Sequence, residues 1–317
     1  MYNNGERFYR YSRYLEQKFG TKVQKLSINV GFSCPNRDGT IDTEGCIYCN
    51  NQSFTPKYCT SSTSIAEQID KGIKFFERKR NYSYLAYFQS YTNTHTDPET
   101  LYKMLLDTAE NQNIVGIIIS TRPDCVSNDI LEVLLKINNL KPLAVEFGVE
   151  STLNRSLELL NRGHNYQQVC DSVNRLSETG IETGVHLILG IPGETRDEMV
   201  NHATEISKLP ISTVKLHQLQ IIKNTKLAEM YRNGSLSVKL FDWREYVELC
   251  ADFVEHLRPD IAIERFASQA ALELLEVSVW KDVRSYHITH LVQNKLIERD
   301  TFQGKYESNM TVNRKKL

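Results

Sequence analysis

The sequence lacks any long apolar run, and its opposite charges almost cancel. No segment reaches the roughly 18 consecutive apolar residues of a membrane-spanning helix, so no membrane partner is expected. The net charge of −1 and the pI near 6.7 argue against a protein drawn to nucleic acid by its overall field. Any RNA contact would therefore depend on a local patch.

The N-terminus has no apolar stretch of the signal-peptide kind, and a cytoplasmic location is expected. With 15 glycines and 8 prolines, the chain has too little of either for a fibrous or disordered protein. The 7 cysteines are an odd number, which argues against a disulfide framework and leaves metal or catalytic roles open.

Short apolar runs alternate along the chain with segments that begin with helix-capping residues. Ser64 and Glu67 form one predicted capping box, and Thr195 and Glu198 form another. Nearly continuous apolar runs are typical of parallel strands buried on both faces. They cover residues 26–30, 85–88, 115–119, 143–149, 185–191 and 214–222. The pattern predicts an α/β fold, a (β/α)₆ partial TIM barrel.

The predicted barrel leaves a segment at each end of the chain. Residues 24–225 form the core, and residues 1–23 are expected to contain a helix that packs on the barrel. Residues 226–317 form a mostly helical C-terminal extension. No Pro/Gly-rich linker separates these parts.

Three cysteines follow the first predicted strand at once. Cys34, Cys46 and Cys49 have the spacing C-x11-C-x2-C, and ligands of parallel α/β folds lie at the carboxyl ends of strands. Two metal interpretations stay open. A four-iron cluster on three cysteines would leave one iron open for catalysis, whereas a zinc ion would take a fourth sulfur, for which Cys59 is a candidate.

The cysteine segment, GFSCPNRDGTIDTEGCIYCNN, resembles the cluster loop of radical S-adenosylmethionine (SAM) proteins. The resemblance is to the YhcC/YtqA-type group of the branch that contains the Elongator catalytic subunit, in which the long first spacer is typical. It extends over about residues 10–258 with one motif at each strand end. The further motifs are AYFQSYTNT, STRPDC, VEFGVES, NRGHNY, HLILGIPGET and KLHQLQIIKNT.

The resemblance implies a radical SAM enzyme that holds a [4Fe-4S] cluster on the three cysteines. SAM would chelate the fourth iron and receive one electron. Its cleavage would give methionine and a 5′-deoxyadenosyl radical that abstracts a substrate hydrogen. A low-potential electron donor of the flavodoxin or ferredoxin type is the implied partner.

Several residues resemble the SAM contacts of this family. Tyr48 corresponds to the aromatic residue near the adenine, and Gln89, Ser90 and Tyr91 correspond to the group that receives the methionine amino group. Glu146 resembles an acid on the fourth strand that contacts SAM. Ordinary roles stay open for each: a packing tyrosine, a polar strand end, and a buried ion pair with an arginine such as Arg122.

The fifth and sixth strands supply the remaining candidates. Gly190, Pro192 and Gly193 form a sharp strand exit whose backbone is a candidate lining for the adenine, although a simple turn explains them as well. Lys215 and His217 alternate onto one face of the sixth strand. If that face is the barrel interior, these two residues reach the substrate or the SAM carboxylate; otherwise they lie at a solvated strand end.

Three functions remain in competition. Kinship with the Elongator-like branch favours a tRNA base as substrate, and Arg7, Arg10 and Arg13 interleave with aromatic residues in a way that suits RNA. A radical SAM enzyme for a small metabolite is the second hypothesis. The third is a non-catalytic zinc or iron–sulfur module. The sequence leaves the oligomeric state open.

Overall fold

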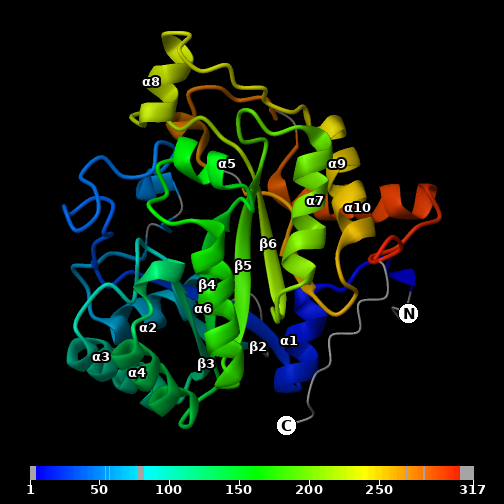
Figure 1. Ribbon diagram of the computed structural model, residues 1–317. Coiled ribbons are helices and arrows are strands. Elements are labelled where there is room, and N and C mark those ends of the chain that lie inside the picture. Colours follow the sequence, from blue (N-terminus) through cyan, green and yellow to red (C-terminus); the bar gives the residue numbers. More distant parts are fainter. Residues whose placement is uncertain are drawn as a thin grey trace.

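The computed structural model describes residues 5–53, 55–56, 58–76, 82–268, 270–280 and 283–307. Its centre is one sheet of seven strands, all parallel, in the order of the chain (Figure 1). The strands are β1 (Lys22–Ile28), β2 (Tyr82–Phe88), β3 (Ile114–Thr121), β4 (Leu143–Glu150), β5 (Glu182–Leu189), β6 (Thr213–Gln218) and β7 (Ala262–Arg265). The sheet curls into a partial barrel, which confirms the predicted fold class.

Helices alternate with the strands and begin where the capping residues predict. The side chains of Ser64, Asp97, Ser127 and Thr195 each accept a hydrogen bond from a backbone N–H of the helix that follows. The helices are α1 (Tyr11–Phe19), α2 (Ile65–Phe75), α3 (Pro98–Glu110), α4 (Asn128–Asn138), α5 (Asn154–Leu159), α6 (Tyr166–Glu178), α7 (Arg196–Ser207), α8 (Lys226–Arg232), α9 (Trp243–His256) and α10 (Ser285–Glu298). None of the described helices is long and apolar enough to cross a membrane.

The strand number differs from the predicted six, because β7 adds a seventh strand beyond residue 225. β7 has only four residues, Ala-Ile-Glu-Arg, and pairs with β6. Its sequence passes from two apolar residues to two charged ones instead of forming a continuous apolar run. The apolar pattern used to find the other strands therefore misses it, and the sheet extends into the segment assigned to the C-terminal extension.

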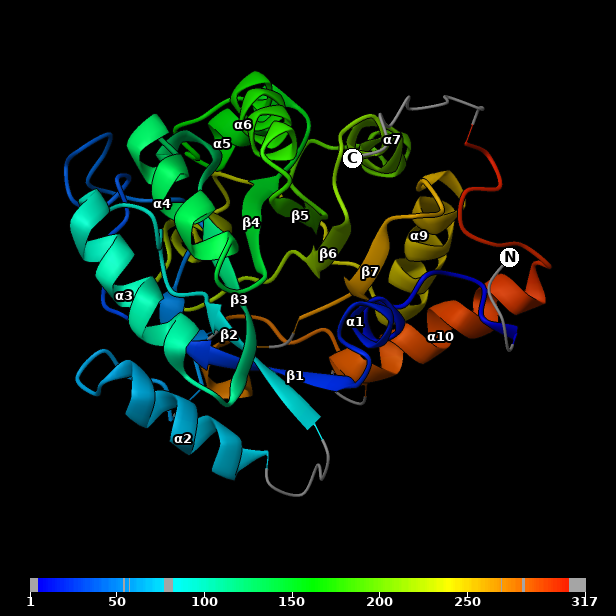
Figure 2. The ribbon, with the colours of Figure 1, turned by 90° about the horizontal axis from the view of Figure 1, so that it is seen from below.

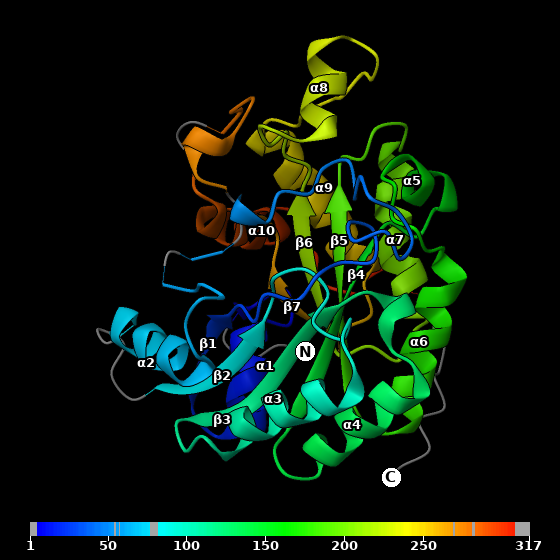
Figure 3. The same cartoon turned by 90° about the vertical axis from the view of Figure 1, so that its left-hand side faces the viewer.

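The two faces of the curled sheet differ in what covers them. Seen from below, the larger helices surround the outside of the arc, and α1 lies at the opening between the first and last strands (Figure 2). Phe88, Ile119 and Val145 belong to the fully buried outer core. On the inner face, Tyr11 and Leu15 of α1 pack with side chains of the strands. The helix α1 therefore covers the base of the barrel, and α8 lies at the opposite end (Figure 3).

Candidate functional site

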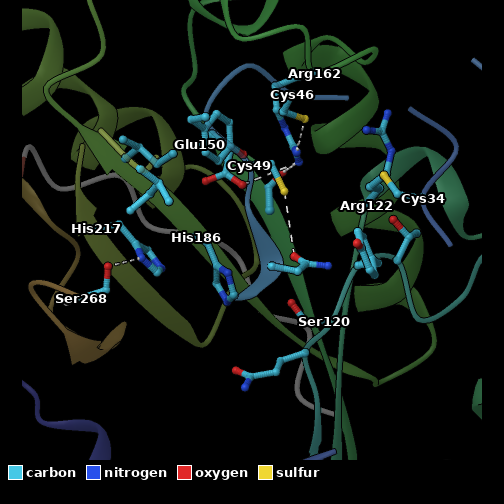
Figure 4. A pocket seen from close by; sticks show the side chains of 18 of the residues that line it. Cys34, Cys46, Cys49, Ser120, Arg122, Glu150, Arg162, His186, His217 and Ser268 are labelled. Atoms are coloured by element: carbon cyan, nitrogen blue, oxygen red, sulfur yellow. Dashed lines mark hydrogen bonds and ion pairs between the residues drawn. The ribbon is translucent and has the colours of Figure 1, made fainter. Parts of the chain in front are cut away.

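A cavity opens at the carboxyl ends of the strands, over the inner face of the barrel. Its lining comes from the loop after β1 and from the ends of β2, β3, β4, β5, β6 and β7. Cys34, Cys46 and Cys49 lie toward one end of the cavity, and His217 and Ser268 lie toward the other (Figure 4). The cavity thus has a sulfur-rich end and a nitrogen- and hydroxyl-rich end.

Hydrogen-bond donors from three side chains surround the cysteine loop. Arg162 donates from Nη1 to the Sγ of Cys46 at 3.2 Å, and Asn36 donates to the same sulfur at 3.7 Å. Arg37 donates to the backbone oxygen of Cys49 at 2.8 Å. Burial, and then the charge of Cys46, raises the pKa of the Cys49 thiol to about 11. Because metal binding deprotonates a thiol outright, these residues suit a thiolate-bound group.

The cysteine motif brings three sulfur donors to one cavity, and Cys59 adds none. The three cysteines share one cavity, yet the described residues contain no group of three His, Cys, Asp or Glu side chains close enough to hold one metal ion. Cys59 does not line the cavity, and its thiol lies 3.3 Å from the Oε1 of Gln68. The four-sulfur zinc site that the sequence left open is therefore not formed by Cys59. Three cysteine sulfurs without a fourth suit a four-iron cluster that leaves one iron open.

Glu150, which the sequence reasoning missed, is the carboxylate that lines the cavity. The pairing of β4 with β5 shifts register between Gly148 and Glu150, and Glu150 has φ +68°. This conformation is uncommon for a residue with a side chain and is found at functional sites. Burial raises the pKa of Glu150, although Arg162, 3.7 Å away, and Tyr48 lower it. The available signal was the two-residue period, which places Glu150 nearer the strand end than Glu146.

Of the three residues at the end of β2 that were predicted to contact the methionine amino group, two line the cavity and one does not. Gln89 and Tyr91 line the cavity, and Tyr91 has φ +57°. Ser90 does not line it and lies 3.4 Å from the hydroxyl of Thr55. Tyr48 also lines the cavity, beside Glu150.

Glu146 lies below the cavity rather than in its lining. Its carboxylate accepts from Lys25 at 2.6 Å, from Lys215 at 2.7 Å and from His186 at 2.9 Å. The ion-pair interpretation that the sequence left open fits these surroundings, with two lysines in place of Arg122. Arg122 instead lines the cavity and pairs with Asp124.

Lys215 and His217 share the inner face of β6 but lie at different depths. Lys215 is 2% exposed and belongs to the layer beneath the cavity, whereas His217 lines the cavity. Burial, and then the charge of Arg265, holds the pKa of His217 well below its usual value. His217 is therefore a neutral imidazole at neutral pH.

The strand exit at Gly190, Pro192 and Gly193 lines a second cavity, near α7 and α9, and not the cavity of the cysteines. Both glycines have positive φ, as the predicted turn requires. Ile188 and Leu219 supply the apolar lining beside the cysteines instead. The predicted backbone contact of this turn with adenine has no counterpart in the lining of the cysteine cavity.

Comparisons with known proteins agree with this arrangement. Residues 28–206 match the radical SAM superfamily, and residues 211–298 match the Radical_SAM C-terminal domain. The chain is 32% identical to the uncharacterized protein YtqA of Bacillus subtilis over 305 residues, 96% of this chain and 94% of that protein.

Two further similarities are to proteins of the archaeon Methanocaldococcus infernus. The chain is 31% identical to a tRNA uridine(34) acetyltransferase of Methanocaldococcus infernus over 123 residues, 38% of this chain and 22% of that protein. The solved structure of the archaeal Methanocaldococcus infernus Elp3 with an N-terminal deletion aligns with a TM-score of 0.67 and 18% identity. That alignment covers 89% of this chain and 64% of the other, and shows a shared fold.

Proposed function

The chain belongs to the radical SAM superfamily, and we propose that it generates a substrate radical in the cavity at the carboxyl ends of its strands. The observation that carries the proposal is that all three cysteines of the C-x11-C-x2-C motif line the same cavity as Glu150 and Tyr48. Sulfur donors and groups that suit SAM thereby share one cavity.

Members of this superfamily use a [4Fe-4S] cluster and SAM, and the residues of the cavity fit both. Cys34, Cys46 and Cys49 would hold the cluster, while Glu150 and Gln89 would accept from the polar groups of SAM. When bound, the cluster and SAM supply a one-electron cleavage that yields methionine and a radical able to take a hydrogen atom from carbon.

The protein contributes positive charge near the cysteines and a barrel base that is covered by a helix. Arg162 and Arg37 bring positive charge to the sulfur-rich end. The helix α1 covers the base of the barrel, which is its closed end. The substrate therefore enters at the carboxyl ends of the strands, which form the open end of the barrel. Radical SAM enzymes need an electron donor, and a flavodoxin or ferredoxin type suits this one.

A tRNA base is the substrate that the similarities favour, because one relative is a tRNA uridine(34) acetyltransferase. The arginines that the sequence suggests for RNA contact, Arg7, Arg10 and Arg13, do not support a tRNA substrate. Arg10 and Arg13 pair with Glu6, and Arg7 pairs with Asp300. These arginines lie in or just before α1, at the opposite end of the barrel from α8 (Figure 1). An RNA surface must therefore lie at the open end.

A small metabolite is the second candidate, and it is favoured by Arg265, an arginine in the cavity lining that has no carboxylate partner among the described residues. A charged group of a small molecule would satisfy it.

Anaerobic reconstitution of the wild type, with Cys46→Ala and Cys170→Ala as variants, tests the shared chemistry. We expect about four irons per chain and formation of 5′-deoxyadenosine from the wild type and Cys170→Ala only. One zinc and no iron in the wild type would refute the proposal. Nucleoside and metabolite profiles of a deletion strain, complemented with the wild type or Cys46→Ala, then separate tRNA from a small molecule.

A further inference from the structure

The layer beneath the cavity contains two ammonium groups and two carboxylates that balance. Lys25 pairs with Glu146 at 2.6 Å and also with Glu264. Lys215 pairs with Glu146 at 2.7 Å and with Glu264 at 3.3 Å. Each lysine contacts both carboxylates, so the two ammonium charges balance the two carboxylate charges within this floor.

Arg265 adds one positive charge just above this balanced layer. It follows Glu264 on β7, pairs in register with Lys215, and lines the cavity. Its Nη2 contacts the Nε2 of His217 at 3.1 Å, and its Nε is buried with no hydrogen-bond partner. Across the described part of the chain, no carboxylate lies within ion-pair distance of Arg265. A partly buried guanidinium without an anion is costly unless a ligand supplies one.

The other arginines of the lining have anionic surroundings of their own. Arg122 pairs with Asp124 at 2.8 Å, and Arg162 lies 3.7 Å from Glu150. Arg37 lies at the sulfur-rich end, bonded to Cys49. Arg265 differs from all three, because it is remote from the cysteine loop along the sheet and its nearest polar contact is a neutral imidazole.

The contacts of His217 prepare a second donor beside Arg265. A guanidinium can only donate, so the Nε2 of His217 accepts, and its Nδ1 carries the proton. Nδ1 then donates to the Oγ of Ser268 at 3.0 Å. The hydroxyl hydrogen of Ser268 is thereby left to donate elsewhere, and Ser268 also lines the cavity.

We propose that Arg265 and Ser268 form a subsite for an anionic group of the substrate, a carboxylate or a phosphate, at the end of the cavity away from the cysteines. The guanidinium plane suits either group, because both offer two oxygens to its paired N–H donors. The proposal rests on the proposed function, since it names the chemistry of the molecule that receives the radical.

Titration calorimetry on the anaerobic protein carrying its cluster and SAM tests this subsite. The probes are inorganic phosphate and acetate, each at constant ionic strength. We expect one of them to bind the wild type, and Arg265→Gln to weaken that binding about tenfold or more. Arg265→Lys should recover part of the loss, and Ser268→Ala should cost several-fold. Arg232, an exposed arginine paired with Glu276 at 3.0 Å, is the matched control, and Arg232→Gln should change nothing.

Each result has a defined meaning. Preference for phosphate or for acetate identifies the source of the anion, and either supports the subsite. Failure of both to bind the wild type, or equal binding by wild type and Arg265→Gln, overturns it. An equal loss of SAM affinity in Arg265→Gln would assign the arginine to the carboxylate of SAM and also overturn it. Because the titration needs no turnover, its failure is distinct from an absence of 5′-deoxyadenosine, which would refute the proposed function.

Discussion

The floor of the barrel and the cavity above it both contain buried charge, but they satisfy it differently. In the floor, Glu146 accepts hydrogen bonds from two lysines and a histidine. In the cavity, Glu150 has one arginine at 3.7 Å and a strained backbone, and Arg265 has no carboxylate partner within the described ranges of the chain. A charge that is paired by its own protein stabilises the fold, whereas one left underpaired in a cavity is available to a ligand.

The sulfur-rich end of the cavity gives the largest expected effect. Cys34→Ala, Cys46→Ala or Cys49→Ala should abolish both the brown colour of the cluster and the cleavage of SAM, because three sulfurs are needed to hold it. Cys170, a half-buried thiol of α6 outside the cavity, provides the matched control. Iron analysis and chromatography of 5′-deoxyadenosine measure the two effects. Normal iron content in Cys46→Ala would contradict the assignment of the cluster to the sulfur-rich end of the cavity.

The floor should respond to mutation through stability. Glu146→Gln removes the charge shared by Lys25 and Lys215, and breaking a buried pair in this way costs about 3–5 kcal/mol. Urea unfolding measures the free energy. Glu150→Gln, at the end of the same strand, is the matched variant and should lose far less stability. Equal destabilisation of the two variants would remove the distinction between floor and cavity.

His186 lines the cavity and donates to Glu146 of the floor, and it should make the stability of the protein depend on pH. Burial, and then the Lys215 ammonium, lowers the pKa of His186 to about 4. An unfolded histidine titrates near pH 6.5, so the unfolded chain takes up a proton first and stability falls as the pH drops from about 6.5 to 4. For one histidine this loss is about 2 kcal/mol at pH 5 and about 3 kcal/mol at pH 4. Unfolding of the wild type and His186→Gln at pH 7.5 and 5 measures it, and an unchanged difference between the two pH values in the variant would contradict it.

The carboxylate of Glu150 should contribute to the binding of SAM. Glu150→Gln should weaken SAM binding about tenfold or more, because charge-assisted hydrogen bonds contribute about 1.5–3 kcal/mol. The measurement is equilibrium binding of SAM to reconstituted protein, with iron content as the check that the cluster is intact. Tight SAM binding by Glu150→Gln, with weak binding by Glu146→Gln, would reverse the roles given to the two glutamates.

The same contrast explains what the sequence could and could not predict. The strands, their order and the cysteine loop follow from apolar runs, caps and one dense motif, all of which are local. The pairing of Glu146 with Lys25 joins residues of different strands that only the curled sheet brings together. The orientation of Glu150 depends on a bulge in β4, and Arg265 belongs to a strand too short to show a pattern. Local sequence therefore located the site, and tertiary geometry decided which charges face it.

The smallest expected effect concerns RNA, and it compares the two ends of the barrel. Lys223 and Lys226 are exposed beside the cysteine loop, where Lys226 pairs with Glu44. If tRNA is the substrate, reversing both lysines to Glu should weaken its binding. The slope of log affinity against log salt should also become shallower, by about 0.7–0.9 for each phosphate that the protein no longer neutralises. Gel-shift titrations at two salt concentrations measure this slope.

The control variant reverses Arg7, Arg10 and Arg13 to Glu at the closed end of the barrel, the base that α1 covers. These arginines already pair with Glu6 and Asp300, and α1 lies far from the open end of the barrel (Figure 1). Their reversal should leave the salt slope unchanged, since charges beyond about 8–10 Å are screened at physiological salt. If the closed-end variant failed to bind tRNA and the open-end variant still bound it, the RNA would approach the base of the barrel. A tRNA base could not then reach the cavity past α1, and the tRNA hypothesis would give way to a small anionic substrate.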